Sequence, residues 1–327
     1  MQVIIPVAGK GTRLKPHTNT KAKPLISVAG KPVLAHILDG IKNKKSISEV
    51  IFITGHLGSQ IEQYVKKNYS FKVRFIEQAE LNGQASAVKL AEKFIKEDVI
   101  IWFVDTISDA DIDKLTGIKE DGAIYVKQVA DPRRFGQVQA DSSNVVLKIA
   151  EKADPPISSL VNIGLYYVKN YRLMFSCINE LMQKKRMTKG EYFLMDAFQM
   201  MIEKGAKFRS LQVKVWEDCG TPEALLQTNR YFLQLNNNRA PKTVNSIIIP
   251  PVYIEKNAKI ENSIIGPFVS IASNATVRNS IIKDSIINEN AYIENSLLNN
   301  SLIGDNSLFK GQFKKLNIGD SSELEEV

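Results

Sequence analysis

The segment VIIPVAGKGTRLKP, residues 3–16, decides how the first part of the chain folds. Its opening, residues 3–7, is a short apolar run with β-branched side chains, which predicts a buried strand. Glycine, proline and threonine are then frequent over residues 8–31, which indicates a loop. Gly9 and Gly11 let backbone N–H groups approach an anion closely, because no Cβ intervenes. On its own, the loop fits a phosphate site or a plain turn.

Strand and helix patterns alternate along the first 110 residues. We expect strands at 50–54, 73–76 and 99–104, and helices at 32–47, 59–67 and 83–96. This alternation predicts an α/β fold, with a doubly wound, mostly parallel, Rossmann-like sheet and helices on both faces. Ligands bind such sheets beyond the carboxyl ends of the strands. The loop 8–31 and Asp105, which ends a strand, are therefore expected at the same edge.

From about residue 241 the helical periodicity disappears and a short repeat replaces it. Pairs of Ile, Val or Leu recur every five to six residues, and small polar residues, such as the Asn-Ser pairs starting at 262, 279, 295 and 300, separate them. Each turn leaves an apolar edge that a neighbouring turn must cover, so the turns should stack. The pattern resembles a left-handed parallel β-helix of hexapeptide-like repeats, and an ordinary antiparallel sheet is the alternative. We expect two domains, 1–240 and 241–327.

Composition narrows the classes of function. No apolar run in the 327 residues reaches the ~18 that span a bilayer. The chain starts with a strand pattern instead of a secretion signal, and its two cysteines cannot form a disulfide framework. We therefore expect a cytoplasmic protein with no membrane partner. The formal net charge is +8, but the basic residues are dispersed, which favours anionic small substrates over nucleic acid.

A longer signature surrounds the glycine loop. The segments PVAGKGTRLKPHT at 6–18 and KPLISVAGKP at 23–32 together resemble the opening of the sugar-1-phosphate nucleotidyltransferase family. The loop lacks both the third glycine of a dinucleotide fingerprint and the Gly-Lys-Ser/Thr of a P-loop. The resemblance implies a nucleotide-binding site with two positively charged catalytic side chains. The nucleotide-binding residues would be Ala8, Gly9, Gly11 and Thr12, and the catalytic residues Arg13 and Lys23.

The resemblance continues along the chain and implies further roles. Gln78 and Gly83 match the positions that read the base edge, and Gln there is typical of members that use thymine or uracil. Asp105 and Asp218 match two aspartates that hold Mg²⁺, a cation that prefers carboxylate, phosphate and water oxygens. Each residue alone also fits a turn, a cap or a solvated charge; their order and spacing favour the site. The sugar-phosphate contacts would be Gly136, Glu151, Lys152, Asn162 and Gly164.

The implied reaction transfers a nucleotidyl group from a nucleoside triphosphate to a sugar 1-phosphate and releases pyrophosphate. The tail at 316–323 is similar to that of long glucose-1-phosphate thymidylyltransferases, which favours dTTP and glucose 1-phosphate. UTP with a hexose 1-phosphate is the runner-up, and a non-catalytic sugar-nucleotide sensor or scaffold subunit is the alternative of another class. Val104 and Thr106 depart from the family pattern beside Asp105, which leaves the sugar and the activity open.

The C-terminal repeat is expected to be structural, oligomerising or regulatory. β-Helices of this kind often carry acyltransferase sites, which typically need a catalytic histidine. The three histidines, His17, His36 and His56, all lie in the N-terminal part of the chain. We therefore expect no acetyl transfer by the repeat. Its apolar corner residues would permit subunit packing, so we expect a homo-oligomer.

Overall fold

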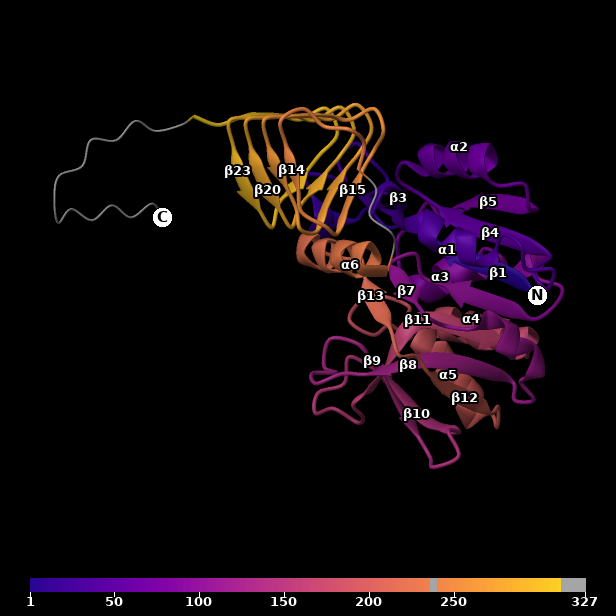
Figure 1. Ribbon diagram of the computed structural model, residues 1–327. Helices are drawn as coiled ribbons and strands as arrows, with labels where there is room; N and C mark the ends of the chain where they lie inside the picture. The colour runs from indigo at the N-terminus through magenta and orange to yellow at the C-terminus, as the bar shows by residue number, and fades with distance from the viewer. Residues whose placement is uncertain (236–239, 313–327) are drawn as a thin grey trace. The chain divides into compact units, whose positions relative to one another are not determined.

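The computed structural model describes residues 1–235 and 240–312, which form two compact units (Figure 1). The first comprises Met1–Ser27 and Lys31–Leu225, and the second comprises Val28–Gly30 and the described residues from Leu226 onward. The division falls inside helix α6 (Pro222–Leu235). The domain boundary at residue 240 rests on the sequence repeat and stays a prediction, and the tail at 316–323 lies outside the described residues.

The first unit is built on a nine-stranded sheet that contains both parallel and antiparallel pairs (Figure 1). Its parallel strands lie in the order β6-β1-β4-β5, and β11 pairs with β6 in the antiparallel sense. The bounds are β1 (Gln2–Pro6), β4 (Glu49–Thr54), β5 (Val73–Glu77), β6 (Val99–Trp102) and β11 (Leu160–Val168). The predicted α/β sheet is confirmed.

The remaining strands that precede α6 extend this sheet or form two small ribbons. Strands β8 (Gly122–Gln128), β9 (Gly136–Ala140), β10 (Val146–Glu151) and β12 (Phe208–Gln212) belong to the large sheet. The ribbons pair β7 (Thr106–Ser108) with β13 (Trp216–Asp218), and β2 (Ser27–Val28) with β3 (Lys31–Pro32).

Helices cover both faces of the sheet, which explains why β1 is apolar at successive positions. Val3 and Ile5 pack in one core with α1 and α2, whereas Ile4 packs in the other with α3, α4 and α5. A strand buried on both faces has no polar side to present. The helices are α1 (Val33–Ile41), α2 (Gly58–Asn68), α3 (Gln84–Lys89), α4 (Tyr171–Gln183) and α5 (Leu194–Glu203).

Two helices are shorter than the sequence predicts. The helix expected over 32–47 ends at Ile41, because the lysine-rich stretch that follows offers few apolar anchors. The helix expected over 83–96 ends at Lys89 and tightens, since the Leu90 N–H donates to the Ala87 carbonyl at 3.2 Å. The 3₁₀ turn η3 (Glu92–Phe94) then completes the segment. The described residues contain no helix that is long and apolar enough to cross a membrane.

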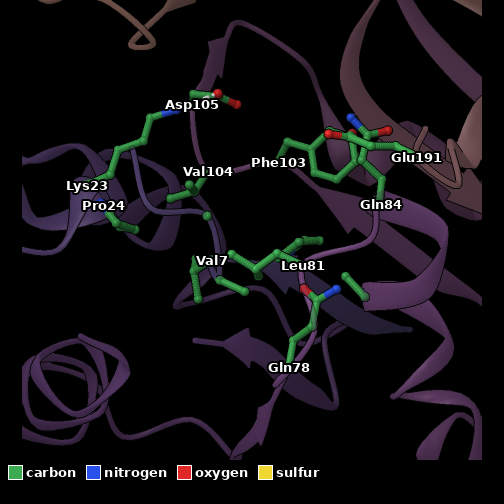
Figure 2. A pocket seen from close by; sticks show the side chains of 15 residues that line it. Val7, Lys23, Pro24, Gln78, Leu81, Gln84, Phe103, Val104, Asp105 and Glu191 are labelled. Atoms are coloured by element: carbon green, nitrogen blue, oxygen red, sulfur yellow. Dashed lines mark hydrogen bonds and ion pairs between the residues drawn. The ribbon is translucent and has the colours of Figure 1, made fainter. Parts of the chain in front are cut away.

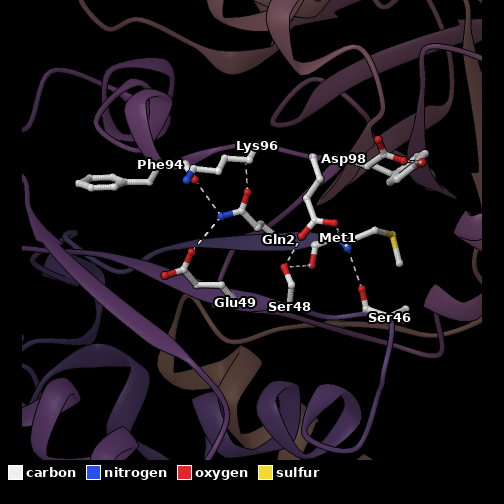
Figure 3. Close-up of polar contacts among 10 residues, drawn as sticks. Met1, Gln2, Ser46, Ser48, Glu49, Phe94, Lys96 and Asp98 are labelled. Carbon is white, nitrogen blue, oxygen red and sulfur yellow. Dashed lines mark hydrogen bonds and ion pairs between the residues drawn. The ribbon is translucent and has the colours of Figure 1, made fainter.

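A buried polar network ties the amino ends of these strands together (Figure 3). Gln2 Nε2 donates to Glu49 Oε2 and to the Phe94 carbonyl, both at 2.9 Å, while the Lys96 N–H donates to Gln2 Oε1 at 2.8 Å. Gln2 and Glu49 are also register partners of β1 and β4. Because buried polar groups must be partnered, this network helps to fix the register at the edge opposite the carboxyl ends.

The second unit contains a parallel β-helix of three four-stranded sheets (Figure 1). Register partners such as Ile265, Ile282 and Leu298 stand one coil apart, and their side chains form the core. All described pairs of these strands are parallel, so the predicted β-helix is confirmed and the antiparallel alternative is wrong.

The twelve strands have the following bounds. The first sheet contains β14 (Ile247–Ile248), β17 (Ile264–Ile265), β20 (Ile281–Lys283) and β23 (Leu297–Asn299). The second contains β15 (Val252–Ile254), β18 (Val269–Ile271), β21 (Ile286–Ile287) and β24 (Leu302–Ile303). The third contains β16 (Lys259–Glu261), β19 (Thr276–Arg278), β22 (Tyr292–Glu294) and β25 (Leu308–Lys310).

Asparagines form the corners of the β-helix. Asn274 and Asn290 both have φ 58, and Asn tolerates this left-handed region better than other non-glycine residues. Their side chains also stack: Asn257 Nδ2 donates to Asn274 Oδ1 at 2.8 Å, and Asn274 Nδ2 donates to Asn290 Oδ1 at 3.2 Å. The recurring Asn of the sequence is therefore a requirement of the corner.

Candidate active site

Three parallel strands deliver the candidate site to one edge of the sheet. Residues 7–9 follow β1, Gln78 follows β5 and residues 103–105 follow β6. These segments line a cavity of about 300 Å³ (Figure 2). Lys23 and Asp105 lie at one side of it, and Gln78 lies at the opposite side (Figure 2). The prediction that the glycine loop and Asp105 share a sheet edge is confirmed.

The cavity contains several of the residues singled out from the sequence and others that were not. The predicted residues that line it are Ala8, Gly9, Lys23, Gln78, Gly83 and Asp105. The further lining residues include Pro24, Leu81, Gln84, Phe103 and Glu191, together with Val104, which the sequence marked only as a departure from the family pattern. Leu81 and Phe103 are apolar and carry no chemical signal in the sequence. Gln84 stands directly after Gly83, so its neighbour is the signal that could have found it.

Lys23 and Asp105 form the charged side of the cavity. Lys23 Nζ lies 2.7 Å from Asp105 Oδ2, and the two side chains are 16% and 31% exposed. Burial raises the pKa of Asp105, but the charge and hydrogen bond of Lys23 outweigh it and hold this pKa below its usual value. Lys23 begins the 3₁₀ turn η2 (Lys23–Leu25), in which Pro24 and Leu25 are buried.

Gly11 allows the loop to pack closely against Lys23. It has φ 63, and a Cβ there would lie 3.0 Å from both Lys23 Cβ and Thr18 Cγ2. The Thr18 hydroxyl also donates to the Gly11 carbonyl at 2.8 Å. The exposed Thr12 and Arg13 follow in the 3₁₀ turn η1 (Thr12–Leu14). Among the described residues, these three predicted positions stand outside the cavity lining itself.

Asp218 lies beside Asp105 although the two are far apart in the sequence. Strand β13 pairs with β7, which sets Asp218 opposite Thr106, and the Cys219 N–H donates to the Asp105 carbonyl at 3.1 Å. Burial and then the charge of Asp105 raise the pKa of Asp218, and Lys23 and Arg13 oppose this rise. A Cβ on Gly220 would meet Asp218 Oδ1 at 2.9 Å and Arg13 Nη2 at 3.0 Å.

The structure therefore brings together the two predicted metal ligands and the two predicted catalytic side chains, Lys23 and Arg13. Within residues 1–235 and 240–312, no group of three or more His, Cys, Asp or Glu side chains could hold a metal ion. A cation at this place would have two carboxylates as protein ligands, Asp105 and Asp218.

Gln78 and Gly83 meet at the opposite side of the cavity. Gln78 is 7% exposed, and its Nε2 donates to Ser86 Oγ at 3.2 Å, while Ser86 Oγ donates to the Gly83 carbonyl at 2.8 Å. Gly83 has φ 124, and a Cβ there would lie 2.5 Å from the backbone N and O of Tyr192. A side chain at position 83 would thus displace the segment that carries Glu191.

The predicted sugar-phosphate residues form a second cluster. Asn162 Nδ2 donates to the Gly136 carbonyl at 3.0 Å, and a Cβ on Gly136 would lie 2.7 Å from Glu151 Oε2. The Gly164 N–H donates to Asn162 Oδ1 at 3.1 Å, and the Phe103 N–H donates to the Gly164 carbonyl at 2.8 Å. Since Phe103 also lines the cavity, the two clusters are continuous.

Glu151 is a buried carboxyl with an altered proton affinity. Burial raises the pKa of Glu151 to about 6, and Lys152 opposes this rise. Lys152 Nζ is 3.8 Å from Glu151 Oε1 and 4.9 Å from the centre of the Phe193 ring. Burial, followed by the charges of Glu151 and Asp105, raises the pKa of Tyr166, so both carboxylates act on one hydroxyl.

Thr106, where the sequence departs from the family pattern, holds the scaffold together. It is 3% exposed, and its hydroxyl donates to the Ile163 carbonyl, which ties β7 to β11. Val104, the other departure, is 7% exposed and lines the cavity. Of the two, Val104 is the one positioned to affect what the cavity admits.

Models of known protein families match both parts of the chain. The nucleotidyl transferase family model matches residues 2–234, and the model of the GlmU-like C-terminal hexapeptide matches residues 231–303. The bifunctional protein GlmU of Methanocaldococcus jannaschii is 32% identical over 262 residues, which are 79% of this chain. The chain spans only 61% of the length of that relative.

Two further comparisons agree with the family match. The glucose-1-phosphate thymidylyltransferase of Streptomyces griseus is 30% identical over 271 residues, covering 80% of this chain and 74% of that protein. A Bacillus anthracis structure assigned as a glucose-1-phosphate thymidylyltransferase, in complex with sucrose, has a TM-score of 0.64 at 26% identity and covers 73% of this chain and 98% of that one. With its signature loop, paired aspartates and hexapeptide β-helix of the left-handed type, the chain belongs to the sugar-1-phosphate nucleotidyltransferases.

Proposed function

We propose that the chain transfers a nucleotidyl group from a nucleoside triphosphate to a sugar 1-phosphate and releases pyrophosphate. The observation that carries the proposal is the continuity of the two clusters through Phe103. The cavity holds the Lys23–Asp105 pair, and the cluster beyond Phe103 holds Glu151 and Asn162. A reaction between two phosphates needs adjoining sites of this kind, since it depends on bringing both reactants together.

The chemistry is an in-line displacement at the α-phosphorus of the nucleotide. An oxygen of the sugar phosphate forms the new P–O bond while the bond to pyrophosphate breaks. This oxygen is already ionised near neutral pH, so no general base is required. The role of the protein is to align the reactants and to neutralise charge, with Lys23 at the α-phosphate, Arg13 at the leaving pyrophosphate and Lys152 at the sugar phosphate.

We include a Mg²⁺ ion held by Asp105 and Asp218 in the proposal. Asp105 takes its present countercharge from Lys23, and repulsion from Asp105 contributes to the raised pKa of Asp218. Two neighbouring carboxylates of this kind, close to a phosphate site, fit a hard divalent cation. When bound, the ion would supply charge neutralisation for phosphate oxygens. Asp105→Asn should abolish turnover, and near-normal pyrophosphate release by this variant would contradict the metal assignment.

We propose dTTP and glucose 1-phosphate as the substrates. Two observations support this choice: Gln78 lines the far side of the cavity, where its amide could pair with a pyrimidine edge, and the Streptomyces griseus relative is named as a glucose-1-phosphate thymidylyltransferase. UTP offers Gln78 the same polar edge, so uridylyl transfer is the second candidate. A non-catalytic sensor is the candidate of another class, and the presence of Asp105 together with Arg13, Lys23 and Asp218 argues against it.

We further propose that the β-helix joins copies of the chain into a homo-oligomer. The outward positions of its first sheet form a ladder of register partners, Ile247, Ile264, Ile281 and Leu297. Ile281 is 46% exposed and Leu297 is 77% exposed, and contiguous apolar surface of this kind favours protein contact. Light scattering of the wild-type chain and of an Ile281→Asp/Leu297→Asp variant would measure the loss of assembly. The cytoplasmic location stays a prediction.

A substrate panel tests the proposed function. The five common nucleoside triphosphates are combined with several sugar 1-phosphates, and pyrophosphate release is measured. We expect the highest rate with dTTP and glucose 1-phosphate. A preference for UTP would select the second candidate. Binding of nucleotide without release in any combination would favour the sensor and contradict nucleotidyl transfer.

A further inference from the structure

We propose that Asn229 is a positioning residue for the signature loop: it holds the turn at residues 29–30 on the β-helix and thereby keeps Lys23 in place beside Asp105. This inference rests on the proposed nucleotidyl transfer, since it is that reaction which gives Lys23 a catalytic role. It gives the β-helix a part in catalysis, although the lining of the cavity includes no described residue beyond Glu191.

The turn between β2 and β3 needs an external support. Its two residues, Ala29 and Gly30, have φ 48 and φ 80. Positive φ at both positions is typical of a type I′ hairpin, in which glycine or asparagine is favoured. Ala29 is neither, and its Cβ makes the left-handed conformation unfavourable. Interactions outside the turn must therefore stabilise this conformation.

Asn229 of α6 supplies such an interaction. It is 0% exposed, and its Oδ1 accepts hydrogen bonds from the Ala29 N–H at 2.9 Å and from the Ser270 hydroxyl at 2.6 Å. Its Nδ2 donates to the Phe268 carbonyl at 3.3 Å. One buried amide thus joins the turn, α6 and the second coil of the β-helix. Losing it would leave the buried Ala29 N–H without that acceptor.

A residue of the β-helix itself, Tyr253, also contacts this turn. A Cβ on Gly30 would lie 2.1 Å from Tyr253 Cε1, so the Tyr253 ring of β15 occupies the space that any other residue at position 30 would need. In accordance with these contacts, Val28–Gly30 belongs to the same compact unit as the β-helix.

The segment between this turn and Lys23 has little conformational freedom. Pro24, Leu25 and Ile26 are all buried. The Ile26 N–H donates to the Lys23 carbonyl at 3.2 Å, and the Val33 N–H donates to the Ile26 carbonyl at 2.9 Å. A shift of the turn would therefore be passed to Lys23, whose ammonium must stay within reach of both Asp105 and the nucleotide phosphates.

The experiment compares Asn229→Ala with a matched control on the same helix. Arg230→Ala breaks the ion pair to Asp284, where Arg230 Nε lies 2.6 Å from Asp284 Oδ1, but leaves the turn untouched. In the full-length chain, Asn229→Ala should lower kcat about tenfold and raise the KM for the triphosphate, with the KM for the sugar phosphate unchanged. Arg230→Ala should stay within about twofold of wild type in all three constants.

Adding Ala29→Gly to Asn229→Ala provides a rescue test. Glycine adopts the left-handed turn without the Cβ penalty, so the double variant should recover most of the lost turnover. Hydrogen exchange gives a readout that does not depend on catalysis: amides of residues 20–32 should exchange faster in Asn229→Ala than in Arg230→Ala. If the wild-type chain catalyses no transfer, this exchange difference still tests the positioning role separately.

Equal kinetic losses in Asn229→Ala and Arg230→Ala would overturn the proposal, because they would indicate a general effect on the β-helix. Wild-type kinetics in Asn229→Ala, or unchanged exchange at residues 20–32, would overturn it as well.

Discussion

Replacing Lys23 by methionine should lower turnover a hundredfold or more while leaving the fold intact. Methionine keeps much of the apolar stem and removes the charge. In the structure this charge lies 2.7 Å from Asp105 Oδ2, on a side chain that is only 16% exposed and that lines the cavity. A preorganised charge in such a site contributes ~3–4 kcal/mol to lowering the barrier, which corresponds to a factor of ~10²–10³.

Lys31 provides the matched control for this prediction. Its Nζ lies 2.7 Å from Asp39 Oδ2, the same distance as in the Lys23 pair, but the Lys31 side chain is 56% exposed. Exposed ion pairs contribute about 0–1 kcal/mol, so Lys31→Met should lose little stability and little activity. The difference in activity between the two variants therefore shows how much the location of the lysine charge matters for turnover.

The assay is the initial rate of pyrophosphate release at saturating substrates, with circular dichroism to confirm folding. We expect the Lys23→Met rate to fall about a hundredfold or more and the Lys31→Met rate to stay within about twofold of wild type. A Lys23→Met rate within about threefold of wild type, or equal effects of the two variants, would refute the catalytic role of Lys23.

Three further predictions concern the sugar cluster, the base side of the cavity and the β-helix. Glu151→Gln should stabilise the folded chain by about 2 kcal/mol at pH 7, because folding raises the pKa of this carboxyl from 4.5 to about 6. The gain should vanish below pH 4.5, where the carboxyl is protonated in both states, should grow as the pH rises from 4.5 to about 6, and should stay constant above that; urea unfolding at several pH values measures it. Gln78→Ala should reduce the preference for pyrimidine over purine triphosphates about tenfold, by loss of one hydrogen bond, as read from kcat/KM ratios. Ile282→Ala should cost ~2–5 kcal/mol of stability, whereas Ile281→Ala, its outward neighbour, should cost under ~1 kcal/mol; thermal unfolding distinguishes them.

Each of the three predictions has an outcome that contradicts it. If Glu151→Gln stabilised the chain equally at every pH, the ionisation of the Glu151 carboxyl would not be the cause of the gain. Unchanged base preference in Gln78→Ala would remove Gln78 from base recognition. Equal losses in Ile281→Ala and Ile282→Ala would contradict the inward and outward positions of this strand.

The sequence predicted those parts of the fold and site that follow from local chemistry. The strand at residues 3–7 and the glycine loop after it could be predicted, because both depend on short-range sequence patterns. The corners of the β-helix were readable because Asn tolerates the left-handed backbone that they require. Asp105 and Asp218 were paired through their family-like contexts, and the ribbon of β7 and β13 brings them together.

Other parts depend on tertiary contacts that leave no local pattern. Leu81 and Phe103 line the cavity, yet apolar residues near a strand end are indistinguishable from core residues in a sequence. The helix expected over 83–96 is interrupted because its second half tightens into a 3₁₀ turn. Asn229 lies in a helix where an asparagine would ordinarily face solvent, and only the folded chain shows that it is buried against Ala29 and Ser270.

The fate of the α-phosphate tests the central claim most directly. Wild-type protein is incubated with Mg²⁺, glucose 1-phosphate and dTTP labelled at the α-phosphorus, and the products are separated. Nucleotidyl transfer predicts that the label moves into a sugar nucleotide while unlabelled pyrophosphate is released in equal amount. Label that stays in dTTP, or that appears only in a free nucleotide without a sugar product, would contradict the proposed reaction.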